Sequence, residues 1–159
     1  MKLLYLCEES THMDLMTDFK KAAAGPFDSK LIHSADTYFK EHKWFHVEKK
    51  QSNGYDHFIY TPDINIDQYK GYFDGYFANQ KESIKAIIDL FRKQNTSHCE
   101  IVATLYYAWK ELIGKKTIIN DEALLTGFYS FHKKKEKFPR NTVLERLRWM
   151  EENNITPRQ

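Results

Sequence analysis

Two histidines with the spacing of metal ligands lie close together in the first third of the chain. His42 and His46 are separated by three residues and are flanked by Glu41 and Glu48. On a helix this spacing places two imidazoles on one face, as in a zinc pair. The glutamate that zinc proteases carry directly after the first histidine is missing, because position 43 is lysine. We therefore expect two surface histidines, no metal site and, without a phosphate-binding loop or dinucleotide motif, no cofactor.

A second pair of reactive side chains is Arg92 and His98, within the segment RKQNTSH. Histidine suits proton transfer and arginine suits the stabilisation of phosphate charge. The spacing resembles the signature of the HEPN ribonucleases, all-helical proteins that pair two such motifs across a dimer. The resemblance implies a ribonuclease in which His98 moves the proton and Arg92 holds phosphate. It departs from the family at Lys93, where a short polar residue is usual. We keep the ribonuclease as a third hypothesis, after a DNA-associated accessory protein and a protein–protein adaptor.

Cys7 and His12 lie close together near the start of the chain. A cysteine nucleophile needs its base nearby in space and a third group that orients the base. No such third group can be identified. We expect Cys7 to be a buried thiol on a core strand. The sequence favours a protein that is not an enzyme.

Near the end of the chain a lysine-rich segment precedes a proline and an amphipathic pattern: FHKKKEKFPRNTVLERLRWMEENNITP, residues 131–157. Lysines suit contacts with DNA phosphates, whereas arginine and asparagine suit guanine and adenine edges. The expected nucleic-acid contacts are Lys133, Lys134, Lys135, Lys137, Arg140, Asn141 and Thr142. The alternative for the lysines is a solvated turn without a partner.

The body of the last helix carries a different kind of surface. At 100° per residue, its apolar side chains from Val143 to Met150 converge on one face, which we expect to be the core side. The opposite face carries Glu145, Trp149 and Glu152. Two outward glutamates are poorly suited to a DNA groove, whereas an outward tryptophan is typical of a protein contact. We predict a protein interface here.

Five aromatic residues recur at helical spacing in the middle of the chain: Tyr69, Tyr72, Phe73, Tyr76 and Phe77. They could form a platform for stacked bases. At this spacing they more often seal a subdomain interface or a homodimer. We therefore assign Tyr69, Tyr72 and Tyr76 to a partner interface.

The elements that must position these groups fall into an N-terminal mixed part and a helical remainder. Apolar runs predict strands over residues 2–7 and 29–34, and helices over 13–25 and 34–45. Asn53-Gly54 predicts a β-hairpin near residues 44–61. Helices are expected over residues 67–80, 81–94, 97–114, 120–132 and 139–154, with a short strand at 116–119. The fold class is α+β, mostly helical, divided into a mixed α/β subdomain at 1–65, connecting helices at 66–96 and a C-terminal subdomain at 97–159.

The order of elements from residue 97 onward resembles the winged-helix variant of the helix-turn-helix. INDEALLTGFYSF carries the resemblance for the second helix, and PRNTVLERLRWMEENNITP carries it for the third. The resemblance implies that the third helix lies in the DNA major groove with its N-terminal end near the bases. The long basic turn before the third helix and the little room for a wing after Ile155 depart from the pattern.

Charge is unevenly distributed, and this bears on partners. Residues 1–79 carry nine lysines against twelve acidic residues, whereas residues 80–159 carry fifteen basic residues, including all five arginines, against ten acidic ones. No apolar run is long enough to span a membrane, and the start lacks the features of a signal peptide. We expect a cytoplasmic accessory protein of prokaryotic type that binds double-stranded DNA or assembles into complexes. The alternative is a protein–protein adaptor, with a homodimer as one form of it.

Overall fold

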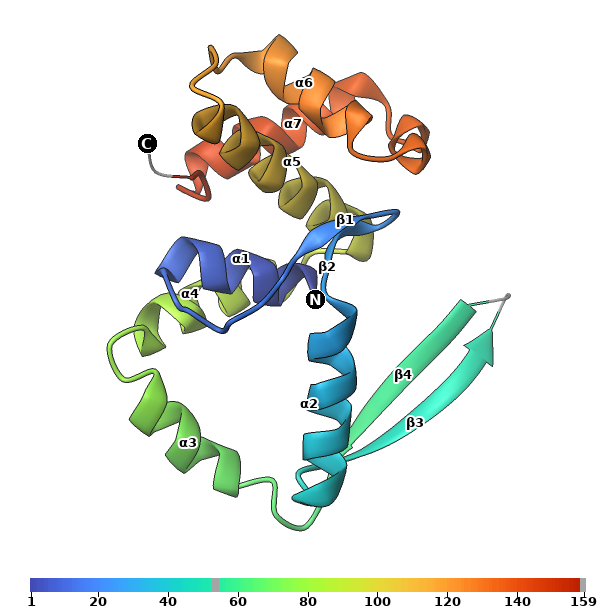
Figure 1. The fold of residues 1–159 in the computed structure, drawn as a ribbon, viewed down its shortest axis with the longest axis vertical. Helices are drawn as coiled ribbons and strands as arrows, with labels where there is room; N and C mark the ends of the chain where they lie inside the picture. The colour runs from blue at the N-terminus through green and yellow to red at the C-terminus, as the bar shows by residue number, and fades with distance from the viewer. Residues whose placement is uncertain (53–54, 158–159) are drawn as a thin grey trace. The chain divides into compact units, whose positions relative to one another are not determined.

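The computed structural model describes residues 1–52 and 55–157 (Figure 1). The elements in chain order are α1 (Lys2–Thr11), β1 (Lys20–Ala22), β2 (Gly25–Phe27), α2 (Ser29–Glu41), β3 (Phe45–Ser52), β4 (Tyr55–Pro62), α3 (Gln68–Tyr76), α4 (Lys81–Phe91), α5 (Thr96–Gly114), α6 (Asp121–Ser130), the 3₁₀ helix η1 (Lys133–Lys137) and α7 (Arg140–Glu152). The mostly helical α+β fold class is confirmed. None of the described helices is both long and apolar enough to cross a membrane.

The chain divides into two compact units. The helical unit is formed by Met1–Asp28 and Glu82–Gln159, and the inserted unit is formed by Ser29–Lys81. This division does not follow the subdomains expected at 1–65, 66–96 and 97–159, because the first 28 residues belong with the C-terminal helices.

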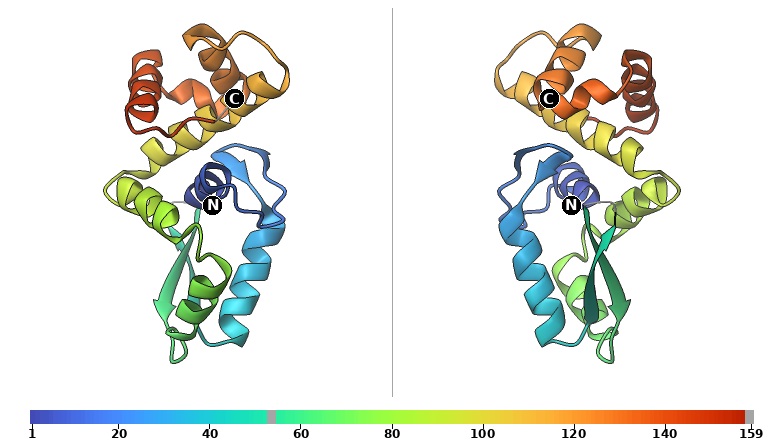
Figure 2. Two further views of the ribbon diagram at one scale, coloured as in Figure 1. Left: turned by 90° about the vertical axis from the view of Figure 1, so that its left-hand side faces the viewer. Right: turned by 90° about the vertical axis from the view of Figure 1, so that its right-hand side faces the viewer.

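Helix α5 is the centre of the helical unit. It packs against α1, β2, α6 and α7 (Figures 1 and 2), and nearly every residue from His98 to Ala108 is buried. The side chain of Asn95 caps it by accepting a hydrogen bond from the backbone amide of His98 at 2.8 Å. Gly127 of α6 lets that helix approach α5 closely, since a Cβ atom there would lie 3.0 Å from the Cβ of Ala108.

The inserted unit contains the antiparallel hairpin of β3 and β4 and the helices α2 and α3. Phe45 pairs with Pro62 at one end of the hairpin, and the ladder continues to Ser52 and Tyr55 (Figure 2). The hairpin expected near 44–61 is thus confirmed, while its Asn53-Gly54 turn lies outside the described residues. Helix α2 packs on β3. In the described part of this unit Trp44 is the only buried side chain.

Three predictions for the first 34 residues were wrong. Residues 2–7, expected as a strand, lie in α1, and residues 29–34 lie in α2. Short apolar runs do not distinguish a strand from one face of a helix. Residues 13–25, expected as a helix, contain β1, the turn after it and Gly25, the first residue of β2, whose φ of +112° favours glycine.

The short strand expected at 116–119 is also absent from the described structure. The backbone amides of Lys116 and Thr117 instead close the last turn of α5, by donating to the carbonyl oxygens of Ile113 and Leu112. Ile118 is 81 % exposed, so no neighbouring strand covers it. The described residues after α7 contain no strand either. The winged-helix resemblance therefore stays a prediction, carried by α5, α6 and α7 only.

Candidate interaction surface

Trp44 anchors the aromatic residues of the inserted unit. Its indole Nε1 donates to the side-chain oxygen of Gln68 at 3.4 Å, which ties the start of α3 to the residue before β3. The ring of Tyr38 meets Trp44 edge-on at 5.2 Å, and the ring of Tyr72 lies 5.5 Å from it. Residues from α2 and α3 therefore converge on one indole.

The connection before α3 is held by backbone hydrogen bonds. The amide of Asp63 donates to the carbonyl of Trp44, and the amide of Asn65 donates to that of Lys43, both at 3.0 Å. The side chain of Asn65 also donates to the carbonyl of His42 at 3.1 Å. These bonds fix where α3 begins relative to the hairpin.

An apolar cleft of about 410 Å³ opens beside Trp44. All the residues that line it are aromatic: Phe39, Trp44, Phe45, Tyr69, Tyr72, Phe73, Tyr76 and Phe77. We call this set the aromatic cleft. It has the volume of a ligand pocket but lacks the charged or amide groups that orient a polar substrate. Tyr72 and Tyr76 are 49 % and 77 % exposed.

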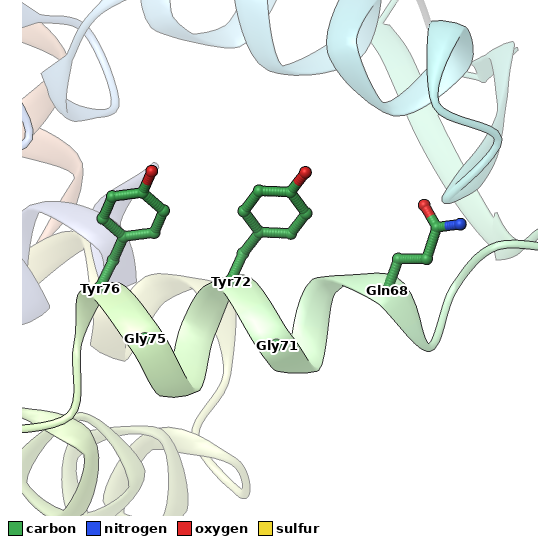
Figure 3. Close-up of a pocket in the computed structure, with 5 residues that line it drawn as sticks. All are labelled: Gln68, Gly71, Tyr72, Gly75 and Tyr76. Carbon is green, nitrogen blue, oxygen red and sulfur yellow. The ribbon is translucent and has the colours of Figure 1, made fainter.

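A second hollow, of about 340 Å³, lies against the same two tyrosines. It is lined by Gln68, Gly71, Tyr72, Gly75 and Tyr76, and we call it the glycine groove. Figure 3 shows Tyr72 and Tyr76 projecting side by side from α3. Their ring planes are within 2° of parallel, with centroids 6.4 Å apart. A Cβ atom added at Gly71 or Gly75 would meet nothing within 4 Å.

Tyr60 of β4 is held against α2. The hydroxyl of Tyr60 donates to Asp36 at 2.7 Å, and its ring lies edge-on to Phe39 at 6.3 Å. Burial and the contact with Asp36 raise the pKa of Tyr60 to about 12. The hydroxyl therefore stays a neutral donor at physiological pH and fixes the hairpin to α2.

The structure separates the residues expected to contact DNA. Lys135 is fully buried, and its ammonium lies 2.7 Å from Glu100, itself only 4 % exposed. Lys137 reaches the other oxygen of the same carboxylate at 3.2 Å. The expectation that Lys135 contacts phosphate was wrong, because its ammonium is buried and paired with Glu100 inside the helical unit.

Carboxylates also neutralise the arginines of α7. Arg140 pairs with Glu122 at the start of α6, and Arg148 pairs with Asp121. Thr142 is half-buried, whereas Lys133, Lys134 and Asn141 are exposed, and no ion pair of either lysine is found within the described residues. The carboxylates that neutralise the basic segment come from α5 and α6, not from the acidic first half of the chain.

Trp149 was expected to point outward, but it does not. Its ring lies 4.3 Å from His98 and 5.3 Å from Phe91, both edge-on, and it is half-buried. The end of α4 and the start of α5 cover this side of α7, so α7 is buried on two sides. Glu145 and Glu152 are exposed as predicted. The expected interface residues thus belong to different units, with the tyrosines in the inserted unit.

His98 is poorly placed for catalysis. It is 4 % exposed, and its Nε2 atom is buried without a hydrogen-bond partner among the described residues. Burial, together with the nearby Arg146, lowers the pKa of His98 to about 4. Arg92 is exposed and pairs with Asp89 at 2.9 Å. The geometry gives no support to the ribonuclease hypothesis.

Sequence reasoning found the tyrosines of the aromatic cleft but missed Phe39, Trp44 and Phe45. A detectable signal existed, since Trp44 and Phe45 begin the predicted hairpin and Phe39 lies in the helix predicted just before it. Glu100 was missed as the partner of the lysines, and no spacing links it to residues 35 positions away. Comparison of the chain with family models, with curated proteins and with solved structures finds no match.

Proposed function

We propose that this chain is a complex-forming accessory protein whose aromatic cleft receives apolar side chains of a protein partner. The observation that carries the proposal is a cleft of about 410 Å³ lined entirely by aromatic residues. It lies in a unit with one buried side chain in its described part, so covering the cleft would supply apolar burial that the unit itself lacks. Tyrosine and tryptophan are the residues most often responsible for binding energy at protein interfaces.

The chemistry of the cleft favours a protein partner over a polar small molecule. No charged side chain lines it, so an ionic ligand would lose hydration without gaining a counter-ion. Long aliphatic or aromatic side chains on a partner helix carry no charge, so they would not lose the hydration of an ion on entry. The chain is then an adaptor rather than an enzyme, and its two free cysteines accord with a cytoplasmic setting.

A photo-reactive benzoylphenylalanine in place of Tyr69 tests the proposal in cells that produce the chain. The proposal expects a discrete protein conjugate from position 69 and none from Ile118, an exposed control position in the helical unit. The captured protein is then purified and its affinity is measured by calorimetry. Tyr69→Ala should weaken binding at least about tenfold, or 1.4 kcal/mol, whereas Ile118→Ser should leave it unchanged. Equal binding by both variants contradicts the proposal.

DNA contact remains a second candidate because Lys133 and Lys134 are exposed at the start of η1, without a paired carboxylate in the described structure. Of the residues expected to contact DNA, these two lysines and Asn141 are exposed and without an ion pair in the described structure. Two phosphate contacts imply weak binding and a slope of about −2 in log affinity against log salt. Fluorescence anisotropy of a labelled duplex should show binding that Lys133→Glu/Lys134→Glu abolishes and the control Lys93→Glu retains. Absence of binding at low salt removes this candidate.

A further inference from the structure

A cavity of about 420 Å³ lies in the helical unit, lined by residues of α1, of the segment between α1 and β1, and of α5. We call it the acidic pocket. Its volume is in the range of pockets that bind organic ligands. Within the described residues no group of three or more histidine, cysteine, aspartate or glutamate side chains could hold a metal ion. The lining combines three aromatic rings with three carboxylates: Tyr5, Phe19, Tyr107, Glu8, Glu9 and Asp18.

Two of the three carboxylates already have a cation. Asp18 pairs with Lys20 at 3.0 Å, and Glu9 pairs with Lys110. Glu8, which is half-buried, has no ion pair among the described residues. The acidic pocket therefore contains one carboxylate whose negative charge no side chain compensates.

Glu8 is held in position without being neutralised. One oxygen of its carboxylate accepts a hydrogen bond from the backbone amide of Leu15 at 3.0 Å, and the other accepts from the hydroxyl of Thr17. A carboxylate has about four acceptor positions, so these two hydrogen bonds leave room for further donors. A cationic donor in the pocket would supply both the missing charge and the missing hydrogen bonds.

The Tyr5 hydroxyl is a second group in the pocket that lacks a partner. Tyr5 is 2 % exposed, and no hydrogen bond of its hydroxyl is found in the part of the chain that the structure describes. Burial, reinforced by Glu9, raises the pKa of Tyr5, so the hydroxyl stays neutral and its oxygen can accept a hydrogen bond. Tyr5 and Glu8 are three residues apart on α1, which makes their side chains neighbours on one helix face. Because buried polar groups normally have a partner, the Tyr5 oxygen is a second acceptor for a ligand.

The aromatic rings suit the apolar part of a cationic ligand. The rings of Tyr5 and Phe19 meet edge-on at 5.0 Å, and the ring of Tyr107 lies 6.1 Å from that of Tyr5. Aromatic faces attract cations within about 6 Å and can cover the methylene stem of an amine. Lys21 already makes such a contact, since its ammonium lies 5.6 Å from the Tyr107 centroid while it pairs with Glu111 at 2.6 Å.

We propose that the acidic pocket binds an aliphatic primary amine, either a free amine or the lysine side chain of another protein. The ammonium donates to the Glu8 carboxylate and to the Tyr5 oxygen, and the methylenes lie along the rings. An ammonium has three donors and no acceptor, which matches a site built from acceptors. The inference is independent of the proposed function, because the acidic pocket belongs to the helical unit and the aromatic cleft to the inserted unit.

Titration of the ¹⁵N-labelled full chain with pentylamine at constant ionic strength and neutral pH tests the proposal. The Leu15 amide is the reporter, because it donates to Glu8. We expect its NMR signal to shift saturably with pentylamine and to stay in place with pentanol, which has the same length without the charge. Tyr5→Phe, which removes only the hydroxyl, should weaken the binding of pentylamine severalfold.

Glu8→Gln removes the charge but can keep both hydrogen bonds, because the amide oxygen accepts from Leu15 and the amide nitrogen donates to Thr17. This variant should bind pentylamine at least about tenfold more weakly, which corresponds to 1.4 kcal/mol. Glu82→Gln, which removes an exposed carboxylate from α4, should bind like the wild type. The comparison of amine and alcohol on the wild-type chain decides the matter even if Glu8→Gln fails to fold.

Absence of a saturable shift at tens of millimolar pentylamine overturns the inference. Equal binding of pentanol overturns it as well, as does a folded Glu8→Gln variant that binds like the wild type. Nα-acetyllysine methylamide distinguishes the two sources of the amine. Tighter binding than that of pentylamine indicates a lysine side chain of another protein, and binding that is no tighter indicates a free amine.

Discussion

At the scale of single residues, the buried Glu100 carboxylate controls the basic segment. It binds Lys135 and Lys137 and so directs a stretch that resembles a DNA-binding turn into the core. Burial works to raise the pKa of Glu100, but the hydrogen bonds and charges of the two lysines outweigh it and leave the pKa below its usual range. The lysine run is therefore partly a packing feature.

Glu100→Gln should destabilise the helical unit by about 3–5 kcal/mol, because it leaves the Lys135 ammonium buried without a counter-ion. Glu122→Gln, which removes the exposed partner of Arg140, should cost no more than about 1 kcal/mol. Urea unfolding followed by circular dichroism checks both values. A Glu100→Gln variant as stable as Glu122→Gln would contradict the importance of this pair.

His98 should make stability depend on pH. Its folded-state pKa of about 4 lies below the ordinary value of 6.5, so the unfolded chain binds more protons between these two values. The free energy of unfolding is then highest above pH 6.5 and falls as the pH drops toward 4. His98→Phe should lose less stability than the wild type between pH 7.5 and pH 5, measured as the shift of the urea midpoint. Equal shifts would mean that His98 is not the titrating group.

At the scale of elements, helices with caps and clear periodicity could be predicted, while short apolar runs could not. The cap at Asn120 marks the start of α6, where the asparagine side chain accepts from Ala123 at 2.9 Å. Residues 2–7 were assigned to the wrong element because a six-residue run fits a strand and one side of a helix equally well. The site followed the same rule: the tyrosines of α3 have a helical period, whereas Glu100 and Lys135 meet only through tertiary packing.

Two helical glycines should respond differently to alanine. Gly75 lies in open space, so Gly75→Ala should stabilise α3 by about 0.5–1 kcal/mol through helix propensity. Gly127→Ala should gain less or destabilise, because its Cβ would press on Ala108 at 3.0 Å. Paired denaturant titrations of the two variants check the difference. A larger gain at Gly127 would mean that α6 can shift away from α5.

At the scale of the whole molecule, the two units differ in how much they bury. The helical unit encloses α5, whereas the described part of the inserted unit buries only Trp44. A two-stranded hairpin with partial cover is marginal in water. Its stability is expected to rise when a partner covers the aromatic cleft.

Hydrogen–deuterium exchange should therefore separate the units. Amides in the middle of α5 should be the slowest to exchange, and those of α2, β3, β4 and α3 should exchange markedly faster. A partner bound in the aromatic cleft should slow the second group selectively. Uniform protection across both units would contradict this picture.

The insertion of Ser29–Lys81 between the two segments of the helical unit has a consequence for synthesis. Helix α1 is made before the inserted unit, but α5, which packs against α1 and places Tyr106 and Tyr107 beside its buried Tyr5, begins only at Thr96. At about 5–20 residues per second, α1 waits for several seconds on the ribosome before its packing surface exists. During that interval its apolar side chains are accessible to chaperones, whereas the inserted unit consists of contiguous residues and can assemble before α5 is made.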